Sequence, residues 1–326
     1  MALLLTHADI ARLDGMPVAI KAMEHVYGLP PDEAGSRVRV DVPTGNGWLR
    51  IMAATIPGLG VFGYKAMNLA PGIGVRYIVS VYSIASGELL GVVDAREVTT
   101  MRTGACAAVA TRRLARPGLP EIAVVGTGAE ARAQLEAMHE LYPDAVVRVF
   151  SRQQANRERF RAWAADRLGV QVRTCPSLAD AVEGAGVVVL ATKSPTPVLT
   201  KALVAPGVHV NSIGSARRDQ YEIAADAFPL FSPVVCDSPE HVLGEAGDAY
   251  DAVQDGMLAP AMVSSLAQLV RGEVGGGEGD APTLYKSVGT ATQDVALAHS
   301  LLASARTDPG RASTELVGFP AIKEAS

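Results

Sequence analysis

The sequence predicts an α/β protein with a Rossmann-type parallel-sheet domain and a discontinuous α+β domain. Strands and helices alternate from Glu121 onwards, which is the pattern of parallel strands joined by crossover helices. These strands are apolar throughout, as expected when helices cover both faces of the sheet. The residues before Arg116 contain consecutive short strands with tight turns instead, which indicates an antiparallel sheet.

The N-terminal third is predicted to be α+β. Residues 18–27 have helical periodicity and follow Pro17, a residue type that favours the first turn of a helix. Alternating segments separated by turn residues then predict strands at residues 37–42, 48–54, 61–68, 77–83 and 89–94. An alanine-rich helix is predicted over residues 97–114 and ends before Arg116-Pro117-Gly118.

The Pro-Gly pair at residues 117–118 marks a predicted domain boundary. Beyond it, strands are predicted at residues 122–125, 146–150, 170–174, 186–191, 208–213 and 234–237, with helices at 131–141, 156–168 and 178–182. A glycine tract precedes a last strand and a helix over residues 291–305. We therefore predict a Rossmann domain over residues 117–289 and a second domain over residues 1–116 and 290–326.

The composition is that of a packed globular protein. Of 326 residues, 48% are apolar and 19% are charged, and the net charge of -5 gives no reason to expect nucleic acid as a partner. The three cysteines lie far apart, without the spacing of a zinc site, which fits a reducing cytoplasm and no metal centre. No apolar stretch is long enough to span a bilayer, and no signal-peptide pattern is present, so we expect a cytoplasmic protein.

A glycine-rich turn follows the first strand of the Rossmann domain directly. Its sequence is Gly126-Thr127-Gly128-Ala129-Glu130-Ala131, the G-x-G-x-x-A form of the dinucleotide fingerprint. The glycines permit a tight turn and let a pyrophosphate approach the backbone N–H groups at a helix N-terminus. Between a strand and a helix, inside a run of βαβ units, this motif predicts a bound dinucleotide rather than a glycine turn without a ligand.

The end of the second Rossmann strand favours the phosphorylated cofactor. An acidic residue there would bind the ribose 2′-hydroxyl of NAD, whereas this chain has Phe150-Ser151-Arg152-Gln153. Arg152 can meet a 2′-phosphate with its planar guanidinium, and Ser151 can donate a hydrogen bond. The sequence therefore favours NADP(H). NAD(H) is the alternative, with Arg152 stacked on adenine or facing water.

Further short segments lie on both predicted domains: Lys65 and Asn68 in GYKAMN, Asp94 and Arg102-Thr103 in DAREVTTMRTGACAAVAT, VNSIGS at residues 210–215, and KSVG at residues 286–289. With these segments and the GTGAEA turn, the chain resembles the ornithine cyclodeaminase/mu-crystallin family over nearly its whole length. The resemblance implies a nicotinamide cofactor and a small anionic substrate. It also implies the cofactor-binding residues Thr103, Gly126, Thr127, Gly128, Ala129, Glu130, Ala131, Ser151, Arg152, Ala191, Thr192, Ser212, Ile213, Gly214, Lys286, Ser287 and Gly289.

The resemblance assigns the substrate site to the N-terminal domain. It implies Lys65 as the catalytic residue, either an acid/base or a group that orients the substrate carboxylate, and it implies Arg102, Arg39 and Asn68 as substrate-binding residues. A guanidinium suits a carboxylate because its fork is planar and bidentate. From the residues alone, Arg102 also fits a surface salt bridge, and Lys65 also fits an outward-facing strand position. Arg37 lies on the same strand face as Arg39, so the register of this arginine stays open.

The antiparallel sheet is predicted to need a partner. It has an apolar face and no predicted helix to cover it, which is typical of an interface. The family that the chain resembles pairs two such sheets across a two-fold axis. We therefore expect a homodimer through the N-terminal sheet.

The chain departs from the cyclodeaminases at one position. The resemblance predicts an aspartate soon after the fifth Rossmann strand, where it helps ring closure, but Ala216 stands there and Asp219 lies further along the loop. The segment is closer to the ketimine reductase branch. We therefore predict an NAD(P)H-dependent imine or ketimine reductase that forms a small amino acid by hydride transfer to an α-imino acid.

Three alternatives to the reductase stay open from the sequence. The same chemistry in the oxidative direction is that of an amino-acid dehydrogenase of alanine or arginine type. A cyclodeaminase-type lyase with bound NAD would release ammonia without net turnover of the cofactor. A binding protein would hold the dinucleotide without catalysis. For the enzymes, the small-molecule partner is an imino, keto or amino acid.

Overall fold

The computed structural model describes residues 2–13, 15–118, 121–277, 279–307 and 314–317. The chain divides into two compact units, each with its own sheet. Unit 1 contains Met1–Arg102 and Thr290–Ser326, and unit 2 contains Thr103–Gly289. The mixed α/β class and the parallel-sheet domain that the sequence predicts are confirmed.

The first boundary between the units lies inside helix α3 (Ala95–Leu114) rather than after it at residue 117. The second half of α3 belongs to unit 2 because it is bonded to that unit's sheet and helices. The Asn211 amide donates to the hydroxyl of Thr111 at 2.9 Å, and the Thr283 hydroxyl donates to the Leu114 carbonyl at 3.1 Å. Gly104 allows the close approach of helix α4 (Ala129–Leu141), since a Cβ there would lie 2.6 Å from the carbonyl oxygen of Ala133.

Unit 1 is built on a seven-stranded sheet in the order β15-β1-β6-β5-β4-β3-β2. The strands are β1 (Ala2–Leu5), β2 (Gly35–Pro43), β3 (Trp48–Ile56), β4 (Val61–Ala70), β5 (Gly74–Ser83), β6 (Leu89–Asp94) and β15 (Thr314–Leu316). Neighbouring strands are antiparallel except β1 and β6, which are parallel. The sequence does not predict β1 or β15, because runs of four and three residues are too short to show alternation.

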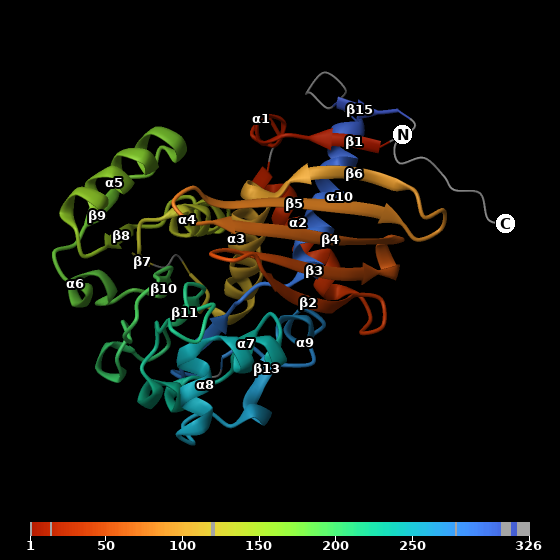
Figure 1. Cartoon of the computed structure of the whole chain (residues 1–326). Helices are drawn as coiled ribbons and strands as arrows, with labels where there is room; N and C mark the ends of the chain where they lie inside the picture. The colour runs from red at the N-terminus through yellow and green to blue at the C-terminus, as the bar shows by residue number, and fades with distance from the viewer. Residues whose placement is uncertain (1, 14, 119–120, 278, 308–313, 318–326) are drawn as a thin grey trace. The chain divides into compact units, whose positions relative to one another are not determined.

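One face of this sheet is covered by helix α10 (Ala291–Thr307), which packs against β3, β4 and β5 and against helix α2 (Gly15–Gly28), as Figure 1 shows. The strand alternation fixes which residues meet α10. Val61, Gly63 and Lys65 of β4 are buried, and a Cβ at Gly63 would meet Val295 of α10. The unit also contains α1 (His7–Ile10) and the short 3₁₀ helix η1 (Pro57–Leu59).

Unit 2 is built on an eight-stranded parallel sheet in the order β13-β12-β14-β11-β10-β7-β8-β9. The strands are β7 (Ile122–Val125), β8 (Val147–Phe150), β9 (Val172–Thr174), β10 (Val187–Leu190), β11 (His209–Ser212), β12 (Val234–Cys236), β13 (Val263–Ser265) and β14 (Thr283–Lys286). Every residue of β7, β10, β11 and β14 is buried. That burial confirms the prediction of a parallel sheet covered on both faces.

The helices of unit 2 alternate with its strands. They are α4 (Ala129–Leu141), α5 (Gln154–Leu168), α6 (Leu178–Val182), η2 (Lys201–Leu203), η3 (Ala225–Leu230), α7 (Pro239–Glu245), α8 (Gly247–Gln254), η4 (Pro260–Met262) and α9 (Leu266–Val270). Within the described residues, none of the helices combines the length and hydrophobicity that a bilayer crossing requires.

Candidate functional site

The predicted cofactor residues of unit 2 lie at one edge of its sheet. Strands β8, β7, β10, β11 and β14 are neighbours in that order, and they run in the same direction. The residues from Gly126 to Ala131 follow β7, Ser151 and Arg152 follow β8, and Ala191 and Thr192 follow β10. Ser212 to Gly214 and Lys286 to Gly289 stand at the ends of β11 and β14. The carboxyl edge of an open parallel sheet is where nucleotides bind in such folds.

The glycine turn after β7 has the geometry that a diphosphate needs. Gly126 has φ +115, and a Cβ there would collide with the carbonyl oxygen of Ala191, so only glycine fits. Gly128 is the N-cap of α4 and has open space beside its Cα, and no side chain caps the helix. The N–H groups of the first turn, around Ala129 and the half-buried Glu130, can therefore bind an anion. Ala131 is fully buried against the sheet.

A buried glutamate joins the loops after β10 and β11. The Glu222 carboxylate accepts the backbone N–H of Thr192 at 2.6 Å and its hydroxyl at 2.9 Å. Its other oxygen accepts the Ser212 hydroxyl and the Gly214 N–H, both at 2.8 Å. Burial raises the pKa of Glu222, and the charge of Lys286 and these donors oppose that rise. Four donors converging on one buried carboxylate fix the backbone of both loops.

Two buried aspartates fix the loop after β14. Lys286 is 1% exposed and donates to Asp248 at 3.0 Å and to the Ser212 hydroxyl at 3.0 Å. Asp237 accepts the hydroxyl of Ser287 at 2.8 Å and the N–H of Gly289 at 2.6 Å. Lys286, which the sequence analysis assigned to the cofactor, is therefore held in an internal ion pair.

The loop after β8 presents an exposed arginine at the N-terminus of α5. Arg152 is exposed, and the Ser151 hydroxyl donates to the Gln153 carbonyl at 3.3 Å. Arg157, one turn into the helix, donates to the Ser151 carbonyl at 2.5 Å and so fixes the backbone of the loop. The N-cap residue Gln153 makes no side-chain cap, which leaves the first turn of α5 open to an anion. Thr103, at the start of unit 2, is buried in α3.

Two of the predicted substrate residues of unit 1, Arg39 and Lys65, stand in one row across the sheet. Arg39 of β2 is paired with Met52 of β3, Met52 with Lys65 of β4, and Lys65 with Val79 of β5. Side chains directly opposite one another in neighbouring strands share a face. Arg39 reaches along this face to the Met52 sulfur at 3.9 Å.

A carboxylate on α10 completes this cluster. Asp294 is fully buried, and its Oδ2 lies 2.6 Å from the Lys65 ammonium. Its Oδ1 accepts the Nε–H of Arg102 at 3.2 Å. Lys65 and Arg102 are themselves 2% and 6% exposed. The structure thus brings together two of the predicted residues with an acid that the sequence analysis did not single out.

The protonation of Lys65 is set by this environment. Burial is the largest of the effects that lower the pKa of Lys65 from 10.5 to about 8, and the charges of Arg102 and Arg39 act in the same direction. The charge and hydrogen bond of Asp294 act in the opposite direction. A pKa of about 8 lets Lys65 release or take up a proton near neutral pH.

Asn68 is not brought to Lys65. It lies three residues along the same strand, and an odd spacing places a side chain on the opposite face, where Asn68 is exposed. The side chain of Arg37 lies outside the part of the structure that is described, so the register of Arg39 against Arg37 is not tested. Ala216 carries no carboxylate, and exposed Asp219 is paired with Arg217 at 3.0 Å.

Sequence reasoning missed Asp294, Glu222, Asp237 and Asp248. Asp294 had a detectable signal, since it directly precedes the apolar run VALA in a segment with helical character. Glu222, Asp237 and Asp248 had none, because acids near loops are usually solvated and nothing in their spacing distinguishes a buried one.

Comparison with known proteins places these features in a family. Residues 4–308 match the sequence profile of the ornithine cyclodeaminase/mu-crystallin family. A Delta(1)-pyrroline-2-carboxylate reductase of Bacillus cereus is 31% identical over 259 residues, which cover 77% of this chain and 79% of the relative.

Two solved structures have the same fold over nearly their whole length. The Thermococcus litoralis Delta(1)-pyrroline-2-carboxylate reductase, in complex with NADH and L-proline, has a TM-score of 0.89 and 27% identity, covering 96% of this chain and 100% of that one. An archaeal alanine dehydrogenase dimer with bound NAD has a TM-score of 0.87 and 27% identity, covering 96% and 99%. The profile match, the reductase relative and the shared fold together show that this chain belongs to the ornithine cyclodeaminase/mu-crystallin family.

Proposed function

We propose that this oxidoreductase reduces a small α-imino acid to an amino acid with NAD(P)H. The observation that carries the proposal is the buried cluster of unit 1, where Lys65 and Arg102 both contact the carboxylate of Asp294 and the charge of Arg39 acts on Lys65. Cations gathered in this way suit an anionic ligand such as a substrate carboxylate, because a guanidinium and an ammonium both form charge-assisted hydrogen bonds with it.

Each residue of the cluster has a distinct task in this proposal. Arg102 binds the substrate carboxylate, because a guanidinium carries donors beyond the Nε–H that reaches Asp294. Arg39, on strand β2, adds a positive charge that attracts the substrate carboxylate. Lys65 supplies the proton that the imine nitrogen requires, since its pKa of about 8 keeps much of it protonated at neutral pH. A bound reduced nicotinamide supplies the hydride, and the protein contributes position and charge.

The residues of unit 2 fit a dinucleotide. Gly126 and Gly128 leave room for a diphosphate at the N-terminus of α4, and Glu222 fixes the neighbouring loops. We assign NADP(H) as the preferred form, because Arg152, Ser151 and the uncapped N-terminus of α5 suit a 2′-phosphate. NAD(H) is the second possibility, since the two similar solved structures hold NADH and NAD.

The oxidative direction is a second candidate for the same site. Similarity to an archaeal alanine dehydrogenase favours it. Oxidation of an amino acid gives the imine, which water then converts to a keto acid. The same residues would serve, with Lys65 accepting the proton instead of donating it.

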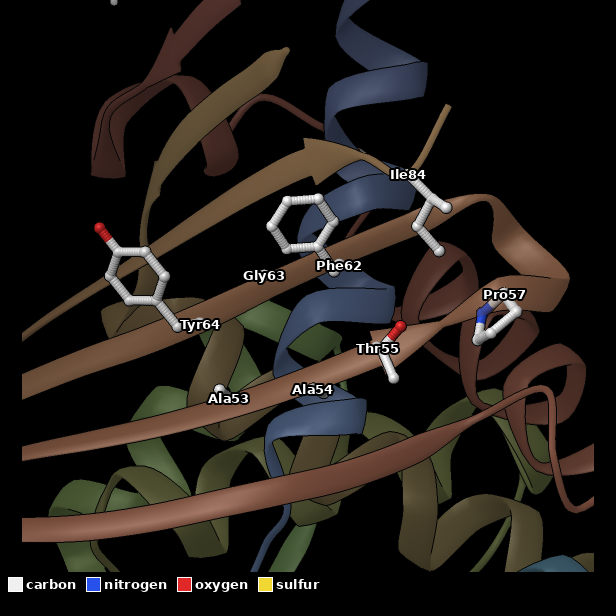
Figure 2. A pocket seen from close by; sticks show the side chains of 8 residues that line it. All are labelled: Ala53, Ala54, Thr55, Pro57, Phe62, Gly63, Tyr64 and Ile84. Carbon is white, nitrogen blue, oxygen red and sulfur yellow. The ribbon is translucent and has the colours of Figure 1, made fainter. Parts of the chain in front are cut away.

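We also propose that the enzyme is a homodimer through the uncovered face of the unit 1 sheet. Figure 2 shows Phe62 and Tyr64 on the side of the strands away from α10. Both residues line a pocket of about 610 Å³. Val40 and Ile78 on the same face are 48% and 45% exposed. An apolar face of this kind is typical of an interface, and the archaeal alanine dehydrogenase is a dimer.

A spectrophotometric screen tests the proposed activity. NADPH and NADH are each offered with preformed cyclic imino acids, and with keto acids plus ammonia or methylamine, while absorbance at the nicotinamide band is followed. We expect stoichiometric oxidation of the cofactor with at least one imino acid, and the loss of this activity in Arg102→Gln. Ammonia release from a diamino acid without net cofactor turnover would overturn the proposal in favour of a lyase.

Light scattering on the purified chain tests the dimer. The wild type should have twice the mass of one chain, and Phe62→Glu should shift it towards the monomer because a carboxylate is costly in an apolar interface. Ile73→Glu is the matched control, since Ile73 is exposed at the β4–β5 turn and not on this face. A monomeric wild type would contradict the proposal.

A further inference from the structure

The carboxylate of Asp294 contacts two cations through two different oxygens. Oδ2 lies 2.6 Å from Lys65 Nζ, and Oδ1 accepts the Nε–H of Arg102 at 3.2 Å. The three residues come from β4, α3 and α10, and Asp294 and Arg102 are 192 positions apart in the chain. Asp294 is therefore the point at which three separate elements of unit 1 are tied together.

The arrangement differs from a one-to-one ion pair, because Asp294 contacts two cations. Taking charges out of water is costly, and a core gains most from a one-to-one pair with good geometry. Here one buried carboxylate contacts two buried cations, and the charge of Arg39 acts on Lys65 as well. An acid that contacts both cations can set the charge of one and the direction of the other.

We propose that Asp294 is the positioning residue of this site: it holds Lys65 as the proton donor and orients Arg102 as the carboxylate clamp. The proposal rests on the reductase function above and adds a residue to it. Asp294 acts through its two neighbours and does not itself contact the substrate.

The surroundings of Lys65 leave this task to Asp294. Arg39 from β2 and Arg102 from α3 are the other charged groups that act on Lys65, and both favour loss of its proton. Its partners in β3 and β5, Met52 and Val79, are apolar. Asp294 on α10 therefore opposes burial and two positive charges, and it keeps Lys65 charged at the pH of catalysis.

Orientation is the second part of the task. A guanidinium is planar, so a bond to its Nε edge fixes the direction in which the remaining N–H groups point. The bond from Arg102 to Asp294 sets that direction before a substrate arrives. Lys65 then donates the proton and Arg102 binds the substrate carboxylate, and Asp294 holds these two cations at a fixed separation.

Asp294→Asn tests the proposal by titration of lysine in the full-length protein. Lysine is labelled with ¹³C at Cε, and the Lys65 signal is assigned by its loss in Lys65→Met. An opposite charge within a few ångströms shifts a pKa by about 1–3 units, so the Lys65 midpoint should fall by that amount in Asp294→Asn. In the pH profile of imine reduction, the alkaline limb of kcat/KM should move down by the same interval.

Two further variants separate positioning from folding. Asp294→Glu keeps the charge, so it should restore the alkaline limb towards that of the wild type, while KM rises severalfold because Arg102 is displaced. Gln293→Leu is the matched control on the same helix, since Gln293 is buried, donates to the Tyr27 hydroxyl at 2.6 Å and is not among the groups that shift the pKa of Lys65. It should leave the Lys65 midpoint unchanged.

An unchanged Lys65 midpoint in folded Asp294→Asn would overturn the proposal, as would an equal shift in Gln293→Leu. If Asp294→Asn does not fold, Asp294→Glu decides. The proposal is contradicted if the alkaline limb of kcat/KM in Asp294→Glu is not restored towards that of the wild type, or if its KM is unchanged. The lysine titration needs neither cofactor nor substrate. A failure of the reductase function is therefore distinguishable from a failure of this inference.

Discussion

The Glu222 carboxylate accepts the backbone N–H of Gly214 at 2.8 Å and thereby closes a bridge between the ends of two parallel strands. The same carboxylate accepts the N–H of Thr192 at the end of β10. Both loops stand at the sheet edge where a dinucleotide is expected. The bridge therefore fixes two of the loops that a dinucleotide would contact.

Glu222→Gln should weaken dinucleotide binding. An amide retains one acceptor oxygen, and its NH₂ group would face donors that the carboxylate now satisfies, so buried N–H groups lose partners. Each unsatisfied group costs about 1–3 kcal/mol, which corresponds to a loss of affinity of roughly 5- to 150-fold if the loops shift. Fluorescence titration of the wild type and Glu222→Gln with NADPH and NADH measures this loss of affinity. Glu183→Gln, at an exposed position of the same unit, should bind normally.

Gly126→Ala should abolish dinucleotide binding. Gly126 has φ +115, which an alanine adopts only with strain, and the added Cβ would collide with the carbonyl oxygen of Ala191. Calorimetry with either nucleotide should detect no binding, and the melting temperature should fall. Gly244→Ala is the control, because Gly244 is in helix α7 with open space at its Cβ, and helix propensity favours alanine there. Normal binding by Gly126→Ala would contradict the assigned turn.

The pH dependence of imine reduction should reflect Lys65. Burial lowers its pKa to about 8, so the proton donor is lost as the pH rises through 8 and kcat/KM should fall tenfold per pH unit above it. Lys65→Met should lower kcat/KM by roughly 10²–10⁴-fold and remove this limb. A limb that persists in Lys65→Met belongs to the substrate imine instead.

Stability should change with pH in the opposite sense. Between about pH 8 and 10.5, the unfolded chain holds the Lys65 proton and the folded chain does not. The contribution of Lys65 to the free energy of unfolding should therefore increase as the pH rises through this window. Urea titrations of the wild type and Lys65→Met across the window measure the difference, and parallel pH profiles would contradict a depressed pKa.

Arg152→Ala should discriminate between the two forms of the cofactor. A charge-assisted bond contributes about 1.5–3 kcal/mol, so NADPH affinity should fall by roughly 10- to 100-fold while NADH affinity changes little. Competition titrations with both nucleotides measure the ratio. Arg167→Ala, exposed near the far end of α5, should affect neither. Equal losses for the two nucleotides would point to adenine stacking rather than to a 2′-phosphate.

Much of the fold was predictable because local patterns carry it. The apolar run from Ile122 to Val125, followed by Gly126 and Gly128, indicates a strand, a tight turn and a helix N-terminus within a few residues. The alternation in β4 and β5 likewise indicates an antiparallel pair. The strands β1 and β15 escaped prediction because they are short, and their pairing depends on contacts far away in the sequence.

The site was predictable only in part. Lys65 and Arg102 were identified through a family resemblance, and their mutual contact with Asp294 was not. Asn68 was assigned to the substrate through the same resemblance, yet the two-residue period of a strand places it on the face opposite Lys65. The units divide inside α3, whereas the sequence places the boundary after this helix. The first half of α3 belongs to unit 1 and the second half to unit 2, and this change does not alter the helical periodicity from which the sequence is interpreted.

Local sequence patterns predict most of the strands and helices and the position of the dinucleotide turn, since φ preferences, hydrophobic period and glycine positions act over a few residues. The tertiary structure alone decided which charges meet. Asp294, Lys65 and Arg102 belong to separate elements of unit 1, and Glu222 reaches the ends of two strands. Such contacts depend on the register of a sheet and on helix packing, which are set by the sum of many weak interactions across the chain.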